Sequence, residues 1–272
     1  MRFFKRLSLS LLLSCFVSSC TAPAKNLWPR WQTHQPDSVQ AINHQEFQDF
    51  LTRYLYQGKD GINLMHYSQV TVPDKAKLAH YLNHLSLTPI SLYNRQEQLA
   101  YWINLYNALT IQLIITHWPV KSITKLHLSP GFFSIGPWDA PLITVEGQEL
   151  TLNDIEHRII RPIWNDARVH YALNCASMSC PQLQGQPFRG KTFESLVTKA
   201  AHEYVNSPQG VFVTDKELIL SQIYEWYHDD FGTDEQMVLH RIAEFANPPL
   251  KNQLLTNKKP IRYHYDWQLN GN

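Results

Sequence analysis

The sequence is poor in cysteine and has almost no excess of charge of either sign, and each shortage excludes a class of protein. Its 272 residues contain four Cys, with no HExxH motif and no paired CxxC motifs, so the spacings that most clearly mark a zinc site are missing. The formal net charge is +1, with Lys and Arg scattered among acidic residues. This distribution gives no electrostatic support for a nucleic-acid partner. The apolar run at residues 7–17 is too short for a stable membrane span.

The first twenty residues are typical of a bacterial lipoprotein signal. A basic start at residues 1–6 precedes the apolar run, and the Val-Ser-Ser-Cys that follows resembles a lipobox, in which the Cys is acylated and becomes the first mature residue. We therefore predict a signal peptide of lipoprotein type at residues 1–19, lipidation at Cys20 and a membrane anchor that faces the periplasm. The residue after Cys20 is Thr21 and not Asp, which favours the outer membrane. An ordinary signal peptide that is cleaved nearby is the alternative.

The remaining chain is predicted to form one domain behind a short tether. Residues 20–40 contain three Pro together with Trp28 and Trp31, and we expect a lipidated tether that continues into a docking segment. Beyond this segment there is no linker or internal repeat. Residues 41–272 are therefore predicted to form a single globular domain.

Apolar residues recur at helical spacing along much of this domain. They predict helices over residues 42–56, 76–85, 95–116, 193–204, 223–231 and 237–245. Thr151 and Asp154 fit the cap of a further helix, which is predicted to end at Arg161-Pro162. Hairpins are predicted at residues 142–152 and 211–221. Because there is no regular βαβ alternation, the predicted fold class is α+β, a single domain of several helices packed on a small, mostly antiparallel sheet with hairpins.

The predicted helix at residues 95–116 is apolar around most of its circumference, so it is expected to be buried on more than one side. Asn104 and Asn107 lie on one face of this helix. A buried Asn without hydrogen bonds costs about 1 to 3 kcal/mol, and the two amides are therefore expected to bind backbone groups of a neighbouring loop. In an alternative interpretation, one of them orients a catalytic His or donates to a developing oxyanion.

The stretch RVHYALNCASMSCP at residues 168–181 is the best candidate for a working site, because it places a His, an Asn and two Cys within eleven residues. Its alternating residue types predict a β-strand, with His170 and Asn174 on the face opposite the core. Small residues and a Pro then end the strand, which would place Cys175 at its mouth. A nucleophilic thiol needs a base within hydrogen-bond reach and a group that orients this base, and all three residue types occur here.

The same stretch also supports a structural interpretation. If Cys15 is removed with the signal and Cys20 is lipidated, then Cys175 and Cys180 are the two Cys of the mature domain. The periplasm is oxidising, so a disulfide between them is a direct expectation and one that we favour slightly for the resting protein. The disulfide competes with a reactive thiolate, although a redox-labile pair could be both.

Several segments stand together in the order found in one protein family. They are residues 101–109, 152–157, 170–175, 179–181, 226–231 and 265–270. These segments resemble the domain of unknown function 547, which occurs in bacterial envelope proteins and in some plant leucine-zipper proteins. The resemblance runs from about residue 47 to residue 270 and implies no settled activity. The resemblance implies that the residues that recur in such domains are, in this sequence, Trp102, Asn104, Tyr106, Asn107, Glu156, His157, Arg161, His170, Cys175 and Pro181. A distant likeness to papain-type and transglutaminase-type folds is also open, although the Cys here follows its His and does not begin an early helix.

The function that we expect is that of a non-catalytic lipoprotein that binds another envelope component. In this interpretation Cys175 and Cys180 form a disulfide, while Glu156, His157 and Arg161 belong to a buried polar network. The eight Trp and thirteen Tyr residues could provide an aromatic groove. The expected partners are the membrane, through Cys20, and an unknown peptide, glycan or protein of the envelope.

The main alternative is a cysteine-dependent hydrolase or acyl transferase. Cys175 would be the nucleophile, His170 or His157 the base, and Glu156 or Asn104 the group that orients the base. The predicted binding residues are Trp102, Tyr106, Asn107, Arg161 and Asn174. A metal site built from His157, His170, Cys175 and Cys180 is the third interpretation. No cofactor is predicted.

Overall fold

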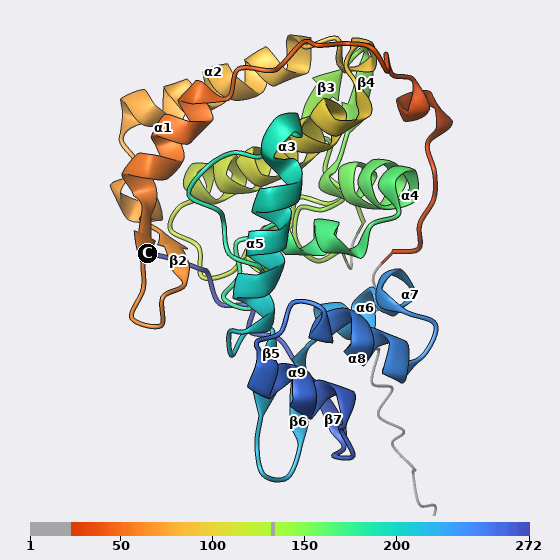
Figure 1. Ribbon diagram of the computed structural model, residues 1–272. Helices are drawn as coiled ribbons and strands as arrows, with labels where there is room; N and C mark the ends of the chain where they lie inside the picture. Colours follow the sequence, from red (N-terminus) through yellow and green to blue (C-terminus); the bar gives the residue numbers. More distant parts are fainter. Residues whose placement is uncertain (1–22, 132–133) are drawn as a thin grey trace, which may run out of the picture.

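The computed structural model describes residues 23–131 and 134–272, and it confirms an α+β fold. The predicted signal peptide and the predicted lipidation of Cys20 lie outside the described residues. Helices predominate, and the strands form three small separate sheets. Figure 1 shows the helices α1 and α2 at one end of the molecule, while the C-terminal elements gather at the other end. No helix in these described ranges is both long and apolar enough to cross a membrane.

The centre of the larger hydrophobic core is the helix α3, which runs over Arg95–Thr116 as predicted. Asn94 caps it by accepting a hydrogen bond from the Glu97 amide, and most of its side chains are buried on every side. The helices α1 (Gln45–Tyr54) and α2 (Val72–Leu87) pack in succession beside it. The α1 helix ends earlier than the predicted residue 56, because the next three residues pair in a hairpin.

Four strand pairings build the three small sheets of the described residues. The antiparallel strands β1 (Leu55–Gln57) and β2 (Asn63–Met65) form the first hairpin, and β3 (Ile143–Val145) and β4 (Gln148–Leu150) form the second. In the third sheet, β5 (Val211–Val213) pairs antiparallel with β6 (Leu218–Ser221), and β6 pairs parallel with β7 (Ile261–His264). Both predicted hairpins are therefore present, whereas β7 was not predicted.

The segment that carries Glu156 and His157 differs from its prediction. It forms a π-helix over Asp154–Ile160 and continues as α4 over Arg161–Trp164, so the predicted end at Arg161-Pro162 is wrong. Pro162 lies in the first turn of α4, where a missing backbone N–H is tolerated. The helix ends at Asn165, which takes a left-handed conformation with φ 47°.

The predicted strand before Cys175 is also wrong. Residues Ala167–Tyr171 form a 3-10 helix, and the chain then runs irregularly to Cys175. Residues on both faces of the predicted strand are buried, because the segment passes between the two hydrophobic clusters. Val169 and Leu173 belong to the larger cluster and Tyr171 to the smaller one. The Asp166 side chain accepts a hydrogen bond from the Arg168 amide and favours the helical turn.

The smaller cluster lies among the C-terminal elements, which are blue in Figure 1. The helices that follow the thiol loop in the sequence are α5 (Phe193–Val205), α6 (Ile223–Trp226), α7 (His228–Phe231), α8 (Glu235–Ala243) and α9 (Pro248–Leu255). Further 3-10 turns span Pro29–Gln32, Tyr67–Gln69, Ile90–Leu92, Ile123–Lys125 and Gly190–Thr192. The α9 helix was not predicted, and the predicted helix at residues 223–231 is divided into α6 and α7.

Segments near both ends of the chain close over this fold. Trp31 is buried and packs edge-on against Trp102 of α3, with ring centroids 5.0 Å apart. At the other end, the Met65 amide donates to the Asn270 carbonyl, so the C-terminus lies beside β2, as Figure 1 shows. Because the same C-terminal segment also pairs with the loop after Cys175, it contributes directly to the candidate site.

Candidate functional site

The loop from Cys175 to Cys180 is held on one side by the C-terminal segment. Ser177 forms an antiparallel bridge with Leu269, and the Asn270 amide donates to the Ala176 carbonyl. Ala176 has a positive φ of 59°, which is unusual for a residue with a side chain. Strained backbone of this kind persists only where the surroundings enforce it, and it often occurs at functional sites.

Two asparagine side chains enforce the path of this loop from the other side. Asn107 of α3 donates to the Ala172 carbonyl at 2.9 Å and accepts from the Asn174 amide at 2.9 Å. The Asn174 side chain accepts from the Ala176 amide and donates to the Pro181 carbonyl. These bonds span both ends of the loop, so Cys175 is fixed from within the core.

The two thiols are free, buried and in contact with each other. Their sulfur atoms are 2.6 Å apart, and the Cys175 amide donates to the Cys180 sulfur at 2.8 Å. The hydroxyl groups of Ser177 and Tyr265 lie 3.2 Å and 3.1 Å from the Cys175 sulfur. The described structure is thus that of the dithiol. The disulfide that the sequence favours for the resting protein stays a prediction.

The surroundings shift the pKa values of the two thiols in opposite directions. Burial acts to raise the pKa of Cys175, but hydrogen bonds from Cys180, Ser177 and Tyr265 outweigh it and leave this pKa lowered. Burial raises the pKa of Cys180, and its contact with Cys175 raises it further. Cys175 is therefore the thiol that ionises first.

The predicted histidine bases are engaged elsewhere. His170 Nε2 lies 2.7 Å from an Asp230 oxygen, and His157 Nδ1 lies 2.9 Å from Arg161. Within the described ranges, no imidazole is hydrogen-bonded to either thiol. The predicted contact between Cys175 and a histidine is not formed, because a buried ionic cluster holds both rings.

This ionic cluster joins Glu156, His157, Arg161, His170 and Asp230. Arg161 Nε lies 2.6 Å from the Asp230 carboxylate, and both side chains are 5% exposed. Glu156 lies 3.9 Å from His170 and shares a hydrogen bond with Tyr227. The Tyr227 ring stacks on His170, with centroids 3.9 Å apart. The expected buried polar network is thus present, and it is larger than predicted, since Asp230 and Tyr227 complete it.

The charges of the cluster compensate one another. Burial acts to raise the pKa of Asp230, but hydrogen bonds from His170 and Arg161 hold it well below its ordinary value. Burial also acts to raise the pKa of Glu156, and the neighbouring His157 and His170 lower it. Burial lowers the pKa of His157. Both carboxyl groups are therefore ionised at neutral pH, as a stable buried cluster with Arg161 requires.

The segment after the predicted lipidation site binds directly to this cluster. Lys25 lies 2.8 Å from Asp230, and Arg161 donates to the Pro23 carbonyl at 2.7 Å. The amides of Asn26 and Trp28 donate to carbonyl groups of the π-helix, at His157 and Arg158. The N-terminal segment is therefore held along the π-helix by both backbone and charge.

The other predicted site residues lie in the core. Asn104 donates to the Phe188 carbonyl and accepts from the Phe188 amide, so it fixes a different loop from the one that carries Cys175. Trp102 and Tyr106 are 1% and 2% exposed and offer no surface to a ligand. Burial raises the pKa of Tyr106, and the charges of Glu156 and Cys175 raise it further. Among the described residues, the Asn104 side chain is hydrogen-bonded neither to the Cys175 loop nor to the ionic cluster.

A cluster of partly exposed aromatic rings lies beside the thiol pair. It consists of Trp138, Trp226, Tyr265 and Trp267 and is called the aromatic cluster below. Trp267 is at its centre, with centroid distances of 4.6 Å to Tyr265, 5.6 Å to Trp226 and 5.7 Å to Trp138. The hydroxyl of Tyr265 connects the cluster to the Cys175 sulfur.

Sequence reasoning missed Asp230, Ser177 and Tyr265 as site residues. Asp230 and Tyr265 lie within the segments at residues 226–231 and 265–270 that carry the family resemblance, so that resemblance was the available signal. Local patterns could not find them, because Asp230 is 60 residues from His170 and Tyr265 is 90 residues from Cys175.

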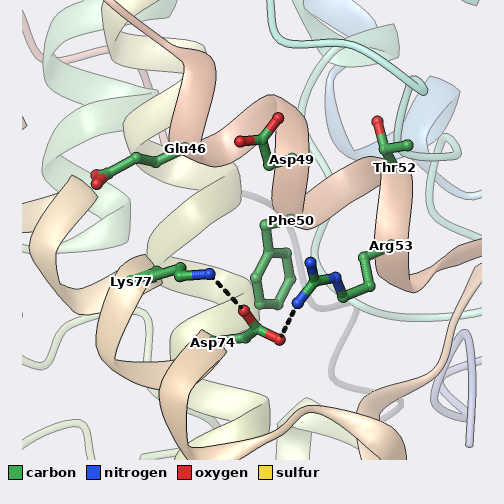
Figure 2. Close-up of a pocket in the computed structure, with 7 residues that line it drawn as sticks. All are labelled: Glu46, Asp49, Phe50, Thr52, Arg53, Asp74 and Lys77. Atoms are coloured by element: carbon green, nitrogen blue, oxygen red, sulfur yellow. Dashed lines mark hydrogen bonds and ion pairs between the residues drawn. The ribbon is translucent and has the colours of Figure 1, made fainter.

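Within the described residues, neither a cluster of metal ligands nor the pocket between α1 and α2 belongs to this site. Among the residues that the structure describes, no group of three or more His, Cys, Asp or Glu side chains could hold a metal ion. A surface pocket of about 510 Å³ lies between α1 and α2, where Figure 2 shows Asp74 between Arg53 and Lys77. Tyr54 and Arg53 also bind this carboxylate, at 2.6 and 2.7 Å, so its charge is already satisfied.

Comparison with known proteins identifies the central part of the chain. Residues 90–205 match the family described as "Protein of unknown function, DUF547". The match runs from before α3 to the end of α5, and it contains both thiols and most of the ionic cluster. It is narrower than the expected range of residues 47–270 and ends before Asp230 and Tyr265. No curated protein and no solved structure matches the chain.

The role of Asn107 can be tested by its removal. Asn107→Ala leaves the Ala172 carbonyl and the Asn174 amide without their partners, and we expect the free energy of unfolding to fall by about 2 to 4 kcal/mol. Gln112→Ala on the same helix is the control, because the Gln112 side-chain oxygen has no hydrogen-bond partner among the described residues. Its effect should be clearly smaller, because its removal leaves no backbone group without a partner. Equal losses in urea denaturation would contradict the assigned role.

The ionic cluster predicts a specific dependence of stability on pH. Because folding lowers the pKa of Asp230, its contribution is fully present above its unfolded pKa of about 3.9 and is lost as the pH falls below that value. Asp230→Asn should lower the free energy of unfolding by about 3 to 5 kcal/mol at pH 7, since Arg161 loses its counter-ion. The loss should shrink below pH 4. Asp229→Asn is the matched control, because the Asp229 side chain is 97% exposed. A loss of stability that is independent of pH would refute this interpretation.

Proposed function

We propose that this protein is a lipid-anchored, periplasm-facing lipoprotein of the bacterial outer membrane, and that its domain binds a glycan of the envelope. The aromatic cluster is the observation on which the binding proposal rests. Its rings come from separate parts of the chain and remain partly exposed, although the fold buries most of its other large aromatic side chains.

The anchoring proposal is supported by the lipobox and by the contacts that follow it. Two residues separate Cys20 from Pro23, whose carbonyl accepts a hydrogen bond from Arg161. Lys25 then pairs with Asp230. An acyl chain on Cys20 would therefore hold the domain close to the membrane surface, with the ionic cluster near the point of attachment.

A glycan fits the chemistry of the aromatic cluster. One face of a sugar ring carries mainly C–H groups and stacks on tryptophan, while its hydroxyl groups need polar partners at the edge. The exposed Asp139 and Gln268 and the half-buried Asp266 stand next to the cluster rings in the sequence and can supply such partners. Tyr and Trp are suited to this combination of apolar and polar contact.

A cysteine-dependent hydrolase or acyl transferase remains the second candidate, and the lowered pKa of Cys175 favours it. The hydroxyl groups of Ser177 and Tyr265 beside the sulfur lower the pKa of Cys175 without a histidine. However, release of an amine or alcohol from an acyl substrate needs a proton donor, and the two predicted bases, His157 and His170, are held by Arg161 and Asp230. Binding therefore remains the primary proposal.

The anchor is tested by Cys20→Ala in cells grown with a radiolabelled fatty acid. We expect the variant to lose the lipid label, and to appear in the soluble periplasmic fraction or to remain as an unprocessed precursor. Cys15→Ala, within the predicted signal, is the control and should keep both label and membrane fractionation. Unchanged labelling of the Cys20→Ala protein would refute lipidation at this residue.

Glycan binding is tested by Trp226→Ala in a pull-down with purified peptidoglycan and in titrations with soluble fragments of its glycan strand. We expect affinity to fall by about tenfold or more, equivalent to about 1.4 kcal/mol, and Trp226→Phe to retain part of it because a ring remains. Phe212→Ala is the control, since Phe212 is 49% exposed on the strand β5 and is not part of the aromatic cluster. Binding to the stem peptide alone, or no difference between Trp226→Ala and Phe212→Ala, would refute the glycan proposal.

A further inference from the structure

We propose that Cys175 and Cys180 form a thiol–disulfide exchange pair that reduces a disulfide-bonded substrate, with Cys175 as the attacking thiol and Cys180 as the resolving thiol. This activity is separate from glycan binding and does not depend on it. The geometry of the loop, the asymmetry of the two thiols and the absence of an imidazole contact each support the proposal.

The loop holds the two sulfur atoms in direct contact. They are 2.6 Å apart and separated by four residues, so closure into a disulfide needs little movement. Bonds from Asn107 and Asn174 fix the start and the end of the loop. The dithiol and the disulfide can therefore share nearly the same backbone.

The two thiols have the different environments that an attacking and a resolving thiol need. Ser177 and Tyr265 place hydroxyl groups beside the Cys175 sulfur, where they stabilise a thiolate. The Cys180 sulfur accepts a hydrogen bond from the Cys175 amide. The order of the pKa values agrees, since that of Cys175 is lowered and that of Cys180 is raised. At neutral pH Cys175 is thus the better nucleophile.

Disulfide exchange also explains why no histidine contacts the thiols in the described ranges. A disulfide releases a thiolate, which is a good leaving group and needs no general acid. Tyr265, whose hydroxyl contacts the Cys175 sulfur, is itself partly exposed in the aromatic cluster, so Cys175 is adjacent to the surface on this side.

The reaction balances in two steps. The Cys175 thiolate attacks one sulfur of the substrate disulfide, forms a mixed disulfide and releases the first substrate thiolate, which takes up a proton. Cys180 then loses its proton and attacks the Cys175 sulfur, which releases the second substrate thiol and leaves the Cys175–Cys180 disulfide. The substrate disulfide gains two electrons and two protons, and the cysteine pair loses them.

The full-length protein, purified in detergent, reduced and freed of reductant, is mixed with glutathione disulfide and followed by mass spectrometry. We expect the wild type to release two equivalents of glutathione and to lose two hydrogen atoms. Cys180→Ser should stop as a mixed disulfide at Cys175, and Cys175→Ser should react at least about tenfold more slowly. Absence of glutathione release from the wild type, or equal reactivity of the two variants, would overturn the proposal.

A redox titration separates exchange from a purely structural disulfide. An exchange pair should shift from dithiol to disulfide within the range of potentials that glutathione buffers cover, whereas a structural disulfide stays oxidised throughout that range. The second outcome would overturn the proposal even if the disulfide forms readily. Native mobility and far-ultraviolet circular dichroism of each variant establish that it is folded.

The positioning role of Tyr265 is tested through the pH profile of Cys175 alkylation in the Cys180→Ser background. Tyr265→Phe keeps the ring and removes the hydroxyl, so the midpoint of the profile should move to higher pH and the rate near pH 7 should fall severalfold. Tyr263→Phe is the matched control, because Tyr263 lies two residues away, packs against the smaller hydrophobic cluster and has no hydrogen bond to either thiol within the described ranges. Identical profiles for the two variants would remove Tyr265 from the site.

Discussion

The buried carboxylate of Asp230 is the constraint on which the surrounding structure depends. A carboxylate that is shielded from water must be paired, and Asp230 receives Arg161 at 2.6 Å, His170 at 2.7 Å and Lys25 at 2.8 Å. These partners come from the helix α4, the 3-10 helix before Cys175 and the N-terminal segment, while Asp230 belongs to α7. One charge thus connects four separate parts of the chain. It also fixes His170, which cannot turn toward Cys175 while this pairing persists.

The thiol pair, in contrast, is held in place by hydrogen bonds from neutral groups. Asn107 and Asn174 hold the loop through backbone bonds, and the C-terminal segment supplies both the pairing strand and the Tyr265 hydroxyl. The result is a thiol whose pKa is lowered by neutral hydrogen-bonding groups and not by a cation. Such a site suits disulfide exchange, whose leaving group needs no protonation, better than acyl transfer. The aromatic cluster beside it gives the same region a surface for recognition.

Predictions from local sequence patterns are confirmed where contacts between residues close in the sequence determine the structure. The helix over Arg95–Thr116 has its predicted bounds because its Asn94 cap and its apolar spacing agree. The two hairpins are also present, since their turns and strands are adjacent in the sequence. The strand predicted before Cys175 failed for the opposite reason. Its alternating pattern implies one exposed face, but the segment lies between two hydrophobic clusters and is buried on both.

The sequence by itself determined the α+β class, the main helices and the segment that carries the thiols. It also determined that the buried asparagines form hydrogen bonds with backbone groups. The tertiary structure decided which groups meet those thiols. Asp230 reaches His170 across 60 residues, and Tyr265 reaches Cys175 across 90. Periodicity and spacing report on neighbours within a helix or a hairpin, so they carry no information about contacts at such separations. These contacts exist because buried charges and polar groups must find partners once the chain is compact.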